Sequence, residues 1–327
     1  MKDPTMYAFA IDGFDGFDDT PALRDLPTPL PGPGEIQIKV RAAGINPLDW
    51  KIAAGQLAGS GAPHAFPLTL GIDVAGQVTA VGEGVDAFTA GEEIFGMSWP
   101  HTFRHGSFAQ YMTAPQDAAL TPRPSGLDPV SAAALPMTGG TALATLDWLD
   151  LKAGETLLIV GATGGVGSYA IQLAAAAGVR VIATAAAAAQ DHAYARGLGA
   201  AETIDHRTAD TADAVAAAHP DGIDAVLDLA GTAEALNVRL APLLRPGARV
   251  VSTVFSADPD ALAARDVKAV NFFYRARPAD MTRLADLVTT GKLRVADTTS
   301  YPLSHIADAH AASTTGHVRG KLVVTNE

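Results

Sequence analysis

The sequence predicts an α/β protein of two domains, one rich in short antiparallel strands and one built on a parallel sheet. Three observations predict it. The chain has 327 residues, more than a single hydrophobic core usually holds. Its first third is rich in Gly and Pro, with alternating stretches such as EIQIKVRAAG and DVAGQVTAVG that are typical of strands between turns. From about Leu127, short apolar runs alternate with helical segments, which indicates a parallel sheet covered on both faces.

The elements of the second domain can be placed in order. Its expected strands are the apolar runs LLIV (157–160), VRVIAT (179–184), DAVLDLA (224–230) and ARVVSTV (248–254). The alternation stops near Arg277. A helix, ADMTRLADLVTTGKL, then leads to a closing strand, KLVVT.

The composition restricts the possible partners and compartments. Hydrophobic residues make up 48% and charged residues 18%, as in a soluble globular protein, and the net charge of −12 argues against nucleic acid. The absence of cysteine excludes disulfides and thiolate metal sites. The beginning MKDPTMYAFAIDGFDGFDD is acidic and does not resemble a signal peptide. No apolar run is long enough to suggest a membrane span, so we expect a cytoplasmic protein.

A glycine-rich turn follows the first of these strands, in LLIVGATGGVGSYAIQLAAAAG (157–178). Gly161, Gly164 and Gly167 are spaced GxxGxxG, with Gly165 as a fourth glycine. Glycine allows a sharp turn and a close approach of the backbone to a pyrophosphate, and the next helix offers free N–H groups and its positive end. We expect a dinucleotide site; the alternative is a tight turn without a ligand. The expected buried stripe of the helix is Val166, Ala170, Leu173, Ala174 and Ala177.

No carboxylate stands where an NAD ribose would need one. Sites that prefer NAD carry an acid about 20 residues further on, which binds the ribose 2′-hydroxyl. That position falls at residues 184–187 here, and the first acid after it is Asp191. An end of a strand without an acid accepts a 2′-phosphate without repulsion, which favours NADPH, although the phosphate still needs a cation.

A set of ordered stretches carries a resemblance to a known family: AAGINPLDWKIAAG, LGIDVAGQVTAVGEGVDAFTAGEEIFG, GSFAQY, ALPMTGGTAL, LKAGETLLIVGATGGVGSYAIQLA, GLGAAETIDH and HVRGKLVV. Over nearly its whole length the chain resembles the zinc-independent medium-chain dehydrogenase/reductase family, in its quinone oxidoreductase and enone reductase branch. The resemblance implies a GroES-like, mostly-β catalytic domain from residues 1–126 and 278–327. It also implies a Rossmann domain, a doubly wound parallel sheet that binds NADP, at residues 127–277.

Zinc-dependent relatives differ from this chain at their ligand positions. They place a cysteine where this chain has Asn46, and a His-Glu pair where it has Ile72 and Asp73. The resemblance therefore implies that no zinc site of that kind forms. The nine histidines show no ligand spacing, so we expect no metal.

The stretch INPLDWK resembles the motif of enone reductases and supplies the expected catalytic residues Asn46, Asp49 and Lys51. By that likeness, Lys51 reaches toward the substrate carbonyl or the nicotinamide ribose, and Asn46 lines the nicotinamide pocket. Hydrogen-bond donors near a carbonyl oxygen can stabilise the enolate that forms when hydride adds to an activated carbon. Alternatively, Lys51 is an ordinary solvated lysine and Asp49 caps the helix it opens. Lys51, a tyrosine or water could supply the final proton.

The resemblance also implies contacts to the cofactor. Thr138 would lie near the nicotinamide end, or cap a helix between the domains. Alanines and Gln190 occupy the region where relatives often have a lysine for the 2′-phosphate, and His206 stands where relatives often have a tyrosine. The remaining cations that could reach the phosphate are Arg207, Arg319 and Lys321. The full expected set is Thr138, Gly161, Thr163, Gly164, Gly165, Val166, Gly167, Thr184, His206, Arg207, Gly231, Phe272, Phe273, Arg319 and Lys321.

Three functions stay open. The first is NADPH-dependent reduction, without zinc, of quinones or of the activated C=C bond of α,β-unsaturated carbonyl compounds. The second is a trans-acting enoyl reductase that serves a thioester in a biosynthetic pathway. The third is an NADPH-binding protein that has lost turnover, against which the pairing of Asn46 and Lys51 with an intact glycine turn argues.

The expected partner is a small hydrophobic carbonyl or quinone substrate, with neither nucleic acid nor a membrane. Large apolar and aromatic side chains could line its pocket: Trp50, Met97, Trp99, His101, Phe272 and Phe273. Members of the family commonly dimerise by pairing the last Rossmann strand, which is VKAVNFFY (267–274) here. We therefore expect a homodimer that covers this apolar edge.

Overall fold

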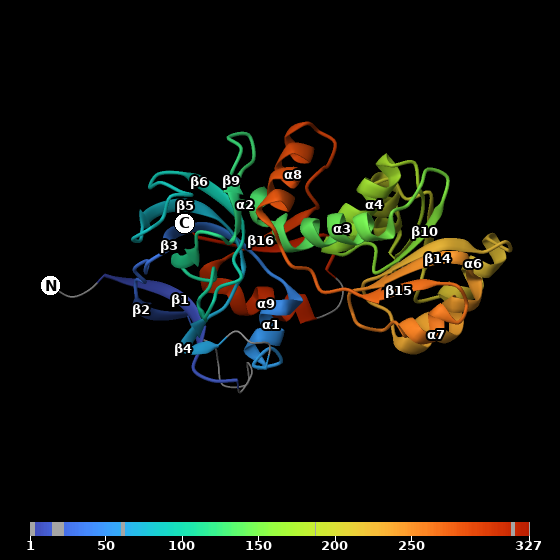
Figure 1. Cartoon of the computed structure of the whole chain (residues 1–327), viewed down its shortest axis with the longest axis horizontal. Coiled ribbons are helices and arrows are strands. Elements are labelled where there is room, and N and C mark those ends of the chain that lie inside the picture. The colour runs from blue at the N-terminus through green and yellow to red at the C-terminus, as the bar shows by residue number, and fades with distance from the viewer. Residues whose placement is uncertain (1–3, 15–22, 60–62, 187, 315–317, 327) are drawn as a thin grey trace. The chain divides into compact units, whose positions relative to one another are not determined.

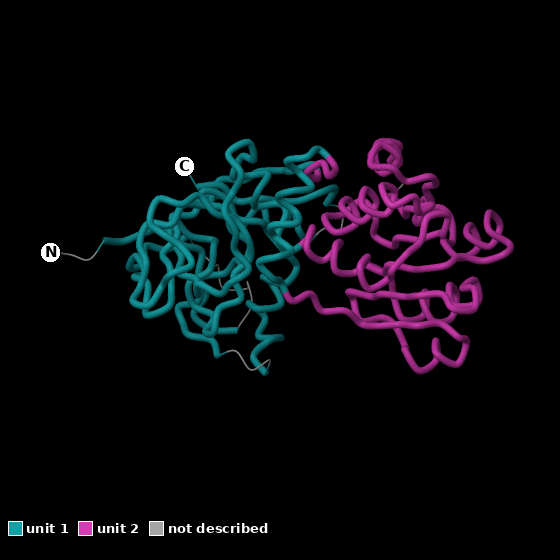
Figure 2. Tube along the Cα trace, turned by 45° about the horizontal axis from the view of Figure 1, so that its top comes forward, with its two compact units in different colours: residues 1–137, 276–291, 297–327 teal, residues 138–275, 292–296 magenta. Residues whose placement is uncertain are grey.

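The computed structural model describes residues 4–14, 23–59, 63–186, 188–314 and 318–326, with the elements labelled in Figure 1. The chain forms two compact units (Figure 2). Unit 1 comprises Met1–Met137, Ala276–Gly291 and Asp297–Glu327, and unit 2 comprises Thr138–Arg275 and Lys292–Ala296. Both ends of the chain therefore contribute to unit 1, and the predicted α/β class is confirmed.

Unit 1 is mostly β. Its strands are β1 (Thr5–Ile11), β2 (Leu23–Pro27), β3 (Glu35–Gly44), β4 (His64–Thr69), β5 (Asp73–Val81), β6 (Glu93–Met97), β7 (Phe103–His105), β8 (Tyr111–Pro115), β9 (Ala119–Pro122), β16 (Thr298–Pro302) and β17 (Lys321–Thr325). Its helices are α1 (Pro47–Ala53), α2 (Pro129–Ala133), α8 (Pro278–Thr289) and α9 (Ile306–Thr314), with the short turn η3 (Leu303–His305). One sheet has the order β2-β1-β4-β7, and the other β16-β17-β3-β5-β6-β9, with β8 also paired to β3.

β3 is the centre of unit 1. It pairs with β5, β8 and β17, so it joins the first part of the chain to its last strand. Ile36, Ile38 and Val40 alternate along it and are buried, as the alternating sequence predicted. Opposite them, Gly76 of β5 lies so close to β3 that a Cβ would meet the Lys39 carbonyl oxygen at 2.3 Å, which restricts this position to glycine.

Unit 2 contains a parallel sheet of the strands β10 (Thr156–Val160), β11 (Arg180–Ala185), β12 (Glu202–Asp205), β13 (Ile223–Asp228), β14 (Leu244–Ser252) and β15 (Lys268–Asn271). The helix α3 (Pro136–Leu149), which begins at the end of unit 1, precedes these strands. Between them lie α4 (Gly165–Ala176), α5 (Ala189–Gly197), α6 (Thr211–Ala218), the π-helical turn η1 (Ala235–Leu240), η2 (Ala241–Leu243) and α7 (Pro259–Ala263). Consecutive residues Leu157, Leu158 and Ile159 are all fully buried. Because neighbouring residues of a strand face opposite sides, the sheet is covered on both faces.

The strand order β12-β11-β10-β13-β14-β15 is that of a Rossmann sheet. From β10 the chain moves first to one side, through β11 and β12, and then to the other, through β13, β14 and β15. In such sheets the ligand binds beyond the carboxyl ends of the strands, where the order reverses. Here that point lies between the ends of β10 and β13.

Two details of unit 2 differ from the sequence predictions. The buried face of α4 differs from the predicted one. Leu173 is half-buried and Ala177 is exposed, whereas Tyr169 and Ile171 are buried. The reason is a segment distant in sequence, 292–296, which covers this helix: Gln172 exchanges two hydrogen bonds with the backbone of Arg294. The expected strand 267–274 is shorter, since Tyr274 is buried against Gly140 of α3.

None of the helices formed by the described residues is long and apolar enough to cross a membrane.

Candidate functional site

The glycine turn between β10 and α4 uses each glycine differently. Gly161 has a positive φ of 83°, which favours glycine. At Gly167, a Cβ would meet the backbone of Ala162 at 2.4 Å, so this glycine lets the helix pack closely on the turn. Gly164 is the residue before the helix, and a Cβ there would have only the Gly161 carbonyl oxygen near it, at 3.6 Å. The space above Gly164 is therefore open to a ligand.

This turn suits a pyrophosphate. The first turn of α4 contains no acidic residue that would offset the positive end of the helix. Thr163, Gly165 and Val166 are half-buried along the same turn. Thr184, expected to contact the cofactor, instead holds the turn in place: its buried hydroxyl accepts a hydrogen bond of 2.9 Å from the Gly161 N–H.

A cavity of about 210 Å³ lies where the strand order reverses. Val160 at the end of β10 and Asp228 at the end of β13 line it, together with His206 and Gly231. The sequence therefore identified two of the residues that the structure brings together here. Arg207 follows His206 after β12, and both are exposed. The His206 ring nitrogen Nδ1 lies 2.7 Å from the Ala185 carbonyl oxygen, which ties the ends of β11 and β12.

Asp228 is a residue of this site that the sequence pattern did not reveal. It is buried, and its Oδ1 accepts a hydrogen bond of 2.6 Å from the Gly231 N–H. Its Oδ2 accepts hydrogen bonds from the Ser252 and Ser256 hydroxyls. The carboxylate thus fixes the loop after β13, and the signal that could have revealed it is an acid at the end of the apolar run DAVLDLA.

The other residues expected at the cofactor are placed as follows. Thr138 is buried near the start of α3. Phe272 is half-buried and Phe273 exposed, both directly after β15. Arg319 lies in unit 1, where its guanidinium Nε is 3.8 Å from an Asp297 carboxylate oxygen. Lys321 also belongs to unit 1, but in its core.

A cluster of buried polar side chains in unit 1 brings together Asn46, Asp49, Asp73 and Lys321. The Asn46 amide donates a hydrogen bond of 2.9 Å to Asp73 Oδ2, and its carbonyl oxygen accepts one from the Lys321 ammonium group. The same ammonium lies 3.4 Å from Asp73 Oδ2. Only 1% of Asn46 and 3% of Lys321 is exposed.

This cluster differs from two expectations. Asn46 was expected to line the nicotinamide pocket, but both polar atoms of its side chain bind other side chains of the core. Lys321 was expected to reach a phosphate, but its ammonium group is enclosed between Asn46 and Asp73. The sequence could not distinguish a buried from an exposed lysine at the start of KLVVT, because the partners of Lys321 lie more than 200 residues away.

Asp49 caps the helix α1, as its alternative role predicted. Its Oδ2 accepts a hydrogen bond of 2.7 Å from the Asn46 N–H, while its Oδ1 is buried and has no hydrogen-bond partner among the described residues. Lys51, on the same helix, is exposed. The structure therefore groups Asn46 and Asp49 in the core and places Lys51 apart, on the surface of α1.

Burial sets the ionisation of this cluster. It raises the pKa of Asp49 well above the usual range, and it raises the pKa of Asp73 against the opposing attraction of Lys321. Burial also lowers the pKa of Lys321, which the two carboxyl groups oppose. Asp73 receives hydrogen bonds from Asn46 and from the Met137 N–H, whereas Asp49 receives only one. These hydrogen bonds and the Lys321 charge favour the ionised form of Asp73, so its pKa is raised less than that of Asp49.

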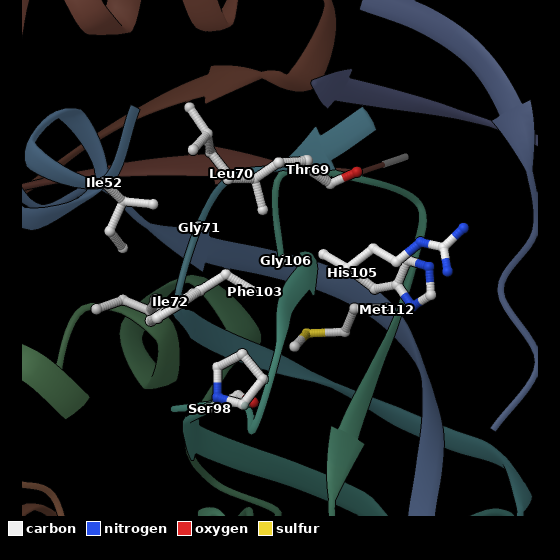
Figure 3. A pocket seen from close by; sticks show the side chains of 13 residues that line it. Ile52, Thr69, Leu70, Gly71, Ile72, Ser98, Phe103, His105, Gly106 and Met112 are labelled. Atoms are coloured by element: carbon white, nitrogen blue, oxygen red, sulfur yellow. The ribbon is translucent and has the colours of Figure 1, made fainter. Parts of the chain in front are cut away.

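The large apolar side chains expected to line a substrate pocket belong mainly to the core of unit 1. Met97 is buried, Trp50 and Trp99 pack against that core, and His101 is exposed. Figure 3 shows a nearby cavity, lined by Ile52, Ser98 and Phe103 among others. Its volume of about 10 Å³ is close to what one water molecule needs, which is too little for a quinone. Within the described residues, no group of three or more His, Asp or Glu side chains could hold a metal ion.

The ionisation of Asp49 gives a testable pH dependence. Because its pKa is raised in the folded state, Asp49 supports folding below its ordinary pKa and loses that contribution as pH rises through the folded value. Asn at this position cannot ionise. We expect the free energy of unfolding of Asp49→Asn, minus that of the unsubstituted protein, to increase as pH rises from about 4 to 8, so that the variant gains relative stability. Urea unfolding at several pH values measures it.

Asp117→Asn provides the control, since Asp117 is an exposed aspartate of the same unit. The change with pH of the difference from the unsubstituted protein should be larger for Asp49→Asn than for Asp117→Asn. A constant difference for Asp49→Asn would contradict a raised pKa at Asp49.

Comparisons with known proteins agree with both units. Residues 32–125 match the family model described as the alcohol dehydrogenase GroES-like domain, and residues 198–324 match the one described as zinc-binding dehydrogenase. The chain is 32% identical over 315 residues to a chloroplast envelope quinone oxidoreductase homolog of Arabidopsis thaliana, covering 91% of this chain and 92% of that protein. It is 29% identical to a chloroplastic NADPH-dependent alkenal/one oxidoreductase of the same plant, covering 98% and 79%.

Among solved structures, the quinone oxidoreductase from Coxiella burnetii aligns with a TM-score of 0.87 at 30% identity, over 98% of this chain and 99% of that one. Unit 1 is thus the GroES-like part and unit 2 the Rossmann part of the fold. The glycine turn lies where the strand order reverses, which is the position at which such sheets bind a nicotinamide cofactor. The chain is therefore an oxidoreductase and belongs to the medium-chain dehydrogenase/reductase family, in its quinone oxidoreductase branch.

Proposed function

We propose that this protein uses NADPH to reduce quinones or the activated C=C bond of α,β-unsaturated carbonyl compounds, and that it does so without zinc. The observation that carries the proposal is the buried cluster of unit 1. Asn46 and Asp73 occupy positions of the ligand motif in zinc-dependent relatives, and here both bind the Lys321 ammonium group. A fixed positive charge between these side chains opposes a metal cation at the same place, and the chain has no thiolate to offer.

In this proposal, residues 127–277 hold the cofactor. The open space above Gly164 and the uncompensated end of α4 support a pyrophosphate at this turn. β11 ends in Ala185 without an acid, and His206 and Arg207 follow the neighbouring strand. The end of β11 itself therefore offers a 2′-phosphate no carboxylate. The neighbouring strand β12 ends in Asp205, the register partner of Ala185, and Arg207 after it is the cation that would offset the negative charge, which supports NADPH over NADH. The relative named NADPH-dependent alkenal/one oxidoreductase gives the same indication.

Residues 1–126 and 278–327 carry the catalytic groups. Bound NADPH supplies the hydride. Lys51 is exposed on α1 and donates a hydrogen bond to the substrate carbonyl oxygen as negative charge develops there. A quinone and an enone share this requirement, because in both the added electron pair is delocalised onto a carbonyl oxygen. We further propose a cytoplasmic homodimer joined through β15, the last strand at one edge of the parallel sheet.

The experiment that tests this function measures NADPH oxidation with a panel of quinones, enones, enoyl thioesters and saturated aldehydes, in the presence of a strong chelator. We expect turnover with quinones or enones and none with saturated aldehydes, because a saturated carbonyl needs stronger polarisation. NADPH should give a higher kcat/KM than NADH. Turnover restricted to saturated aldehydes and abolished by the chelator would contradict the proposal, and a preference for NADH would contradict its cofactor.

The glycine turn allows a test of cofactor binding. Gly164→Ala introduces a methyl group that meets no protein atom closer than 3.6 Å, so the fold should be unaffected. The methyl group would occupy the space proposed for the pyrophosphate, and we expect the Kd of NADPH to rise roughly tenfold or more. Fluorescence titration measures it. Gly197→Ala, at an open position of α5, should leave the Kd unchanged; equal Kd values for both variants would rule out binding at this turn.

Lys51 allows a test of the mechanism. Lys51→Ala should lower kcat/KM for enones by roughly 10²–10³, the range for loss of one donor to a developing oxyanion. Lys51→Arg keeps the charge but changes its shape, so it should restore only part of the rate. NADPH affinity should change little. Lys152→Ala, an exposed lysine of unit 2, is the control. Normal turnover of Lys51→Ala would show that Lys51 is only a surface residue.

A further inference from the structure

Lys321 is a charged residue enclosed in the core of unit 1, at the first position of β17. Only 3% of it is exposed, and its ammonium group meets Asn46 Oδ1 and Asp73 Oδ2. A buried ammonium is stable only beside compensating oxygen atoms, and a buried carboxylate only beside donors. Lys321 and Asp73 therefore depend on each other.

Asp73 connects this ion pair to the start of α3. Its second oxygen, Oδ1, accepts a hydrogen bond of 3.1 Å from the Met137 N–H. The next residue is Thr138, which we expect at the cofactor. Gly44 makes room for this arrangement, because a Cβ there would meet Asp73 Oδ2 at 2.9 Å and the Ala133 carbonyl oxygen at 2.4 Å.

Asn46 connects the same ion pair to the start of α1. Its side chain can satisfy both neighbours in one orientation only: the carbonyl oxygen toward the Lys321 ammonium and the NH₂ group toward Asp73. Its backbone N–H donates to Asp49 Oδ2, which caps α1. Lys321 therefore binds the side chain of Asn46, the residue at which α1 begins, and α1 carries Lys51.

We infer that Lys321 is a positioning residue of the proposed reaction: its buried ammonium group holds Asp73 and Asn46, and through them fixes the starts of α3 and α1. The inference rests on the proposed function for the roles of Thr138 and Lys51. Lys321 itself touches neither substrate nor cofactor in this account, since its ammonium group is already enclosed by Asn46 and Asp73.

The experiment compares Lys321→Met, Asp73→Asn and the double variant at a temperature where each is folded. Lys321→Met leaves Asp73 without its cation, so we expect kcat to fall roughly 10- to 100-fold, as for a misplaced catalytic group. The KM and Kd of NADPH should change less than kcat, because a displaced start of α3 affects only the contact expected of Thr138, while the glycine turn lies in the other unit. The double variant removes both charges and should recover part of the loss in thermal stability, so the two substitutions should not be additive.

The pH dependence of Lys321→Met shows whether Lys321 acts through its charge or only through the volume that its side chain fills. Lys321 attracts the ionised forms of both Asp73 and Asp49, so its removal raises the pKa of both carboxyl groups further. A raised pKa gives stability at low pH that is lost as pH rises through the folded value. We expect both the Tm and the kcat of Lys321→Met to recover as pH falls from about 8 to 5, relative to the unsubstituted protein. Lys321→Arg keeps the charge and should not show this pH dependence.

Lys152→Met, which breaks an exposed pair with Asp150, is the control and should match the unsubstituted protein. Unchanged kcat in Lys321→Met, or loss of NADPH binding with kcat kept at saturation, would overturn the inference.

If Lys321→Met does not fold, a folded double variant supports the ion pair and an unfolded one overturns it. If the unsubstituted protein reduces no substrate of the panel, the proposed function fails, while the coupling in thermal unfolding still decides whether Lys321 holds Asp73.

Discussion

The charge of Lys321 lies where water cannot reach it, so the core of unit 1 has to balance it. A single ammonium group meets Asn46 and Asp73, and burial raises the pKa of the nearby Asp49. This requirement explains several neighbours at once. It fixes the orientation of the Asn46 amide, it excludes a side chain at Gly44, and it sets the point at which β17, the last strand, joins β3. A polar contact within an apolar core thus joins the last strand, β17, to Asn46 and Asp73 in the first part of the chain.

A different constraint governs unit 2. Its sheet is buried on both faces, so polar groups collect at the carboxyl ends of the strands, where backbone N–H groups need acceptors. Thr184 accepts from Gly161 and Asp228 accepts from Gly231, so these two side chains shape the loops and leave the backbone to face a ligand. The position at Gly164 is open because these side chains hold the turn from the side of the sheet. Among the described residues, only the Gly161 carbonyl oxygen lies within 4 Å of a Cβ at Gly164. The side chains thus fix the loops, and the backbone N–H groups remain available to the ligand, as a pyrophosphate site requires.

The sequence predicted the features that local pattern determines. Apolar runs identified β10, β11, β13 and β14, and glycine spacing identified the turn after β10. It did not reveal features that depend on distant partners. The buried face of α4 is set by residues 292–296, more than 100 residues away. Asn46 and Lys321 are 275 positions apart. The local sequence around each suggested a side chain that is accessible to a ligand, whereas in the fold the two side chains bind each other in the core. Asp228 was overlooked because an acid after an apolar run also suits an exposed loop.

The central claim is that hydride is delivered to an activated carbon and not to a carbonyl carbon, since an ammonium group stands where a Lewis acid would be needed. The most direct measurement is the position of deuterium in the product after turnover of an enone with NADPH that carries deuterium at both positions of the nicotinamide C4. The account predicts a saturated ketone with one deuterium at its β carbon. An allylic alcohol with deuterium on the carbinol carbon would contradict it.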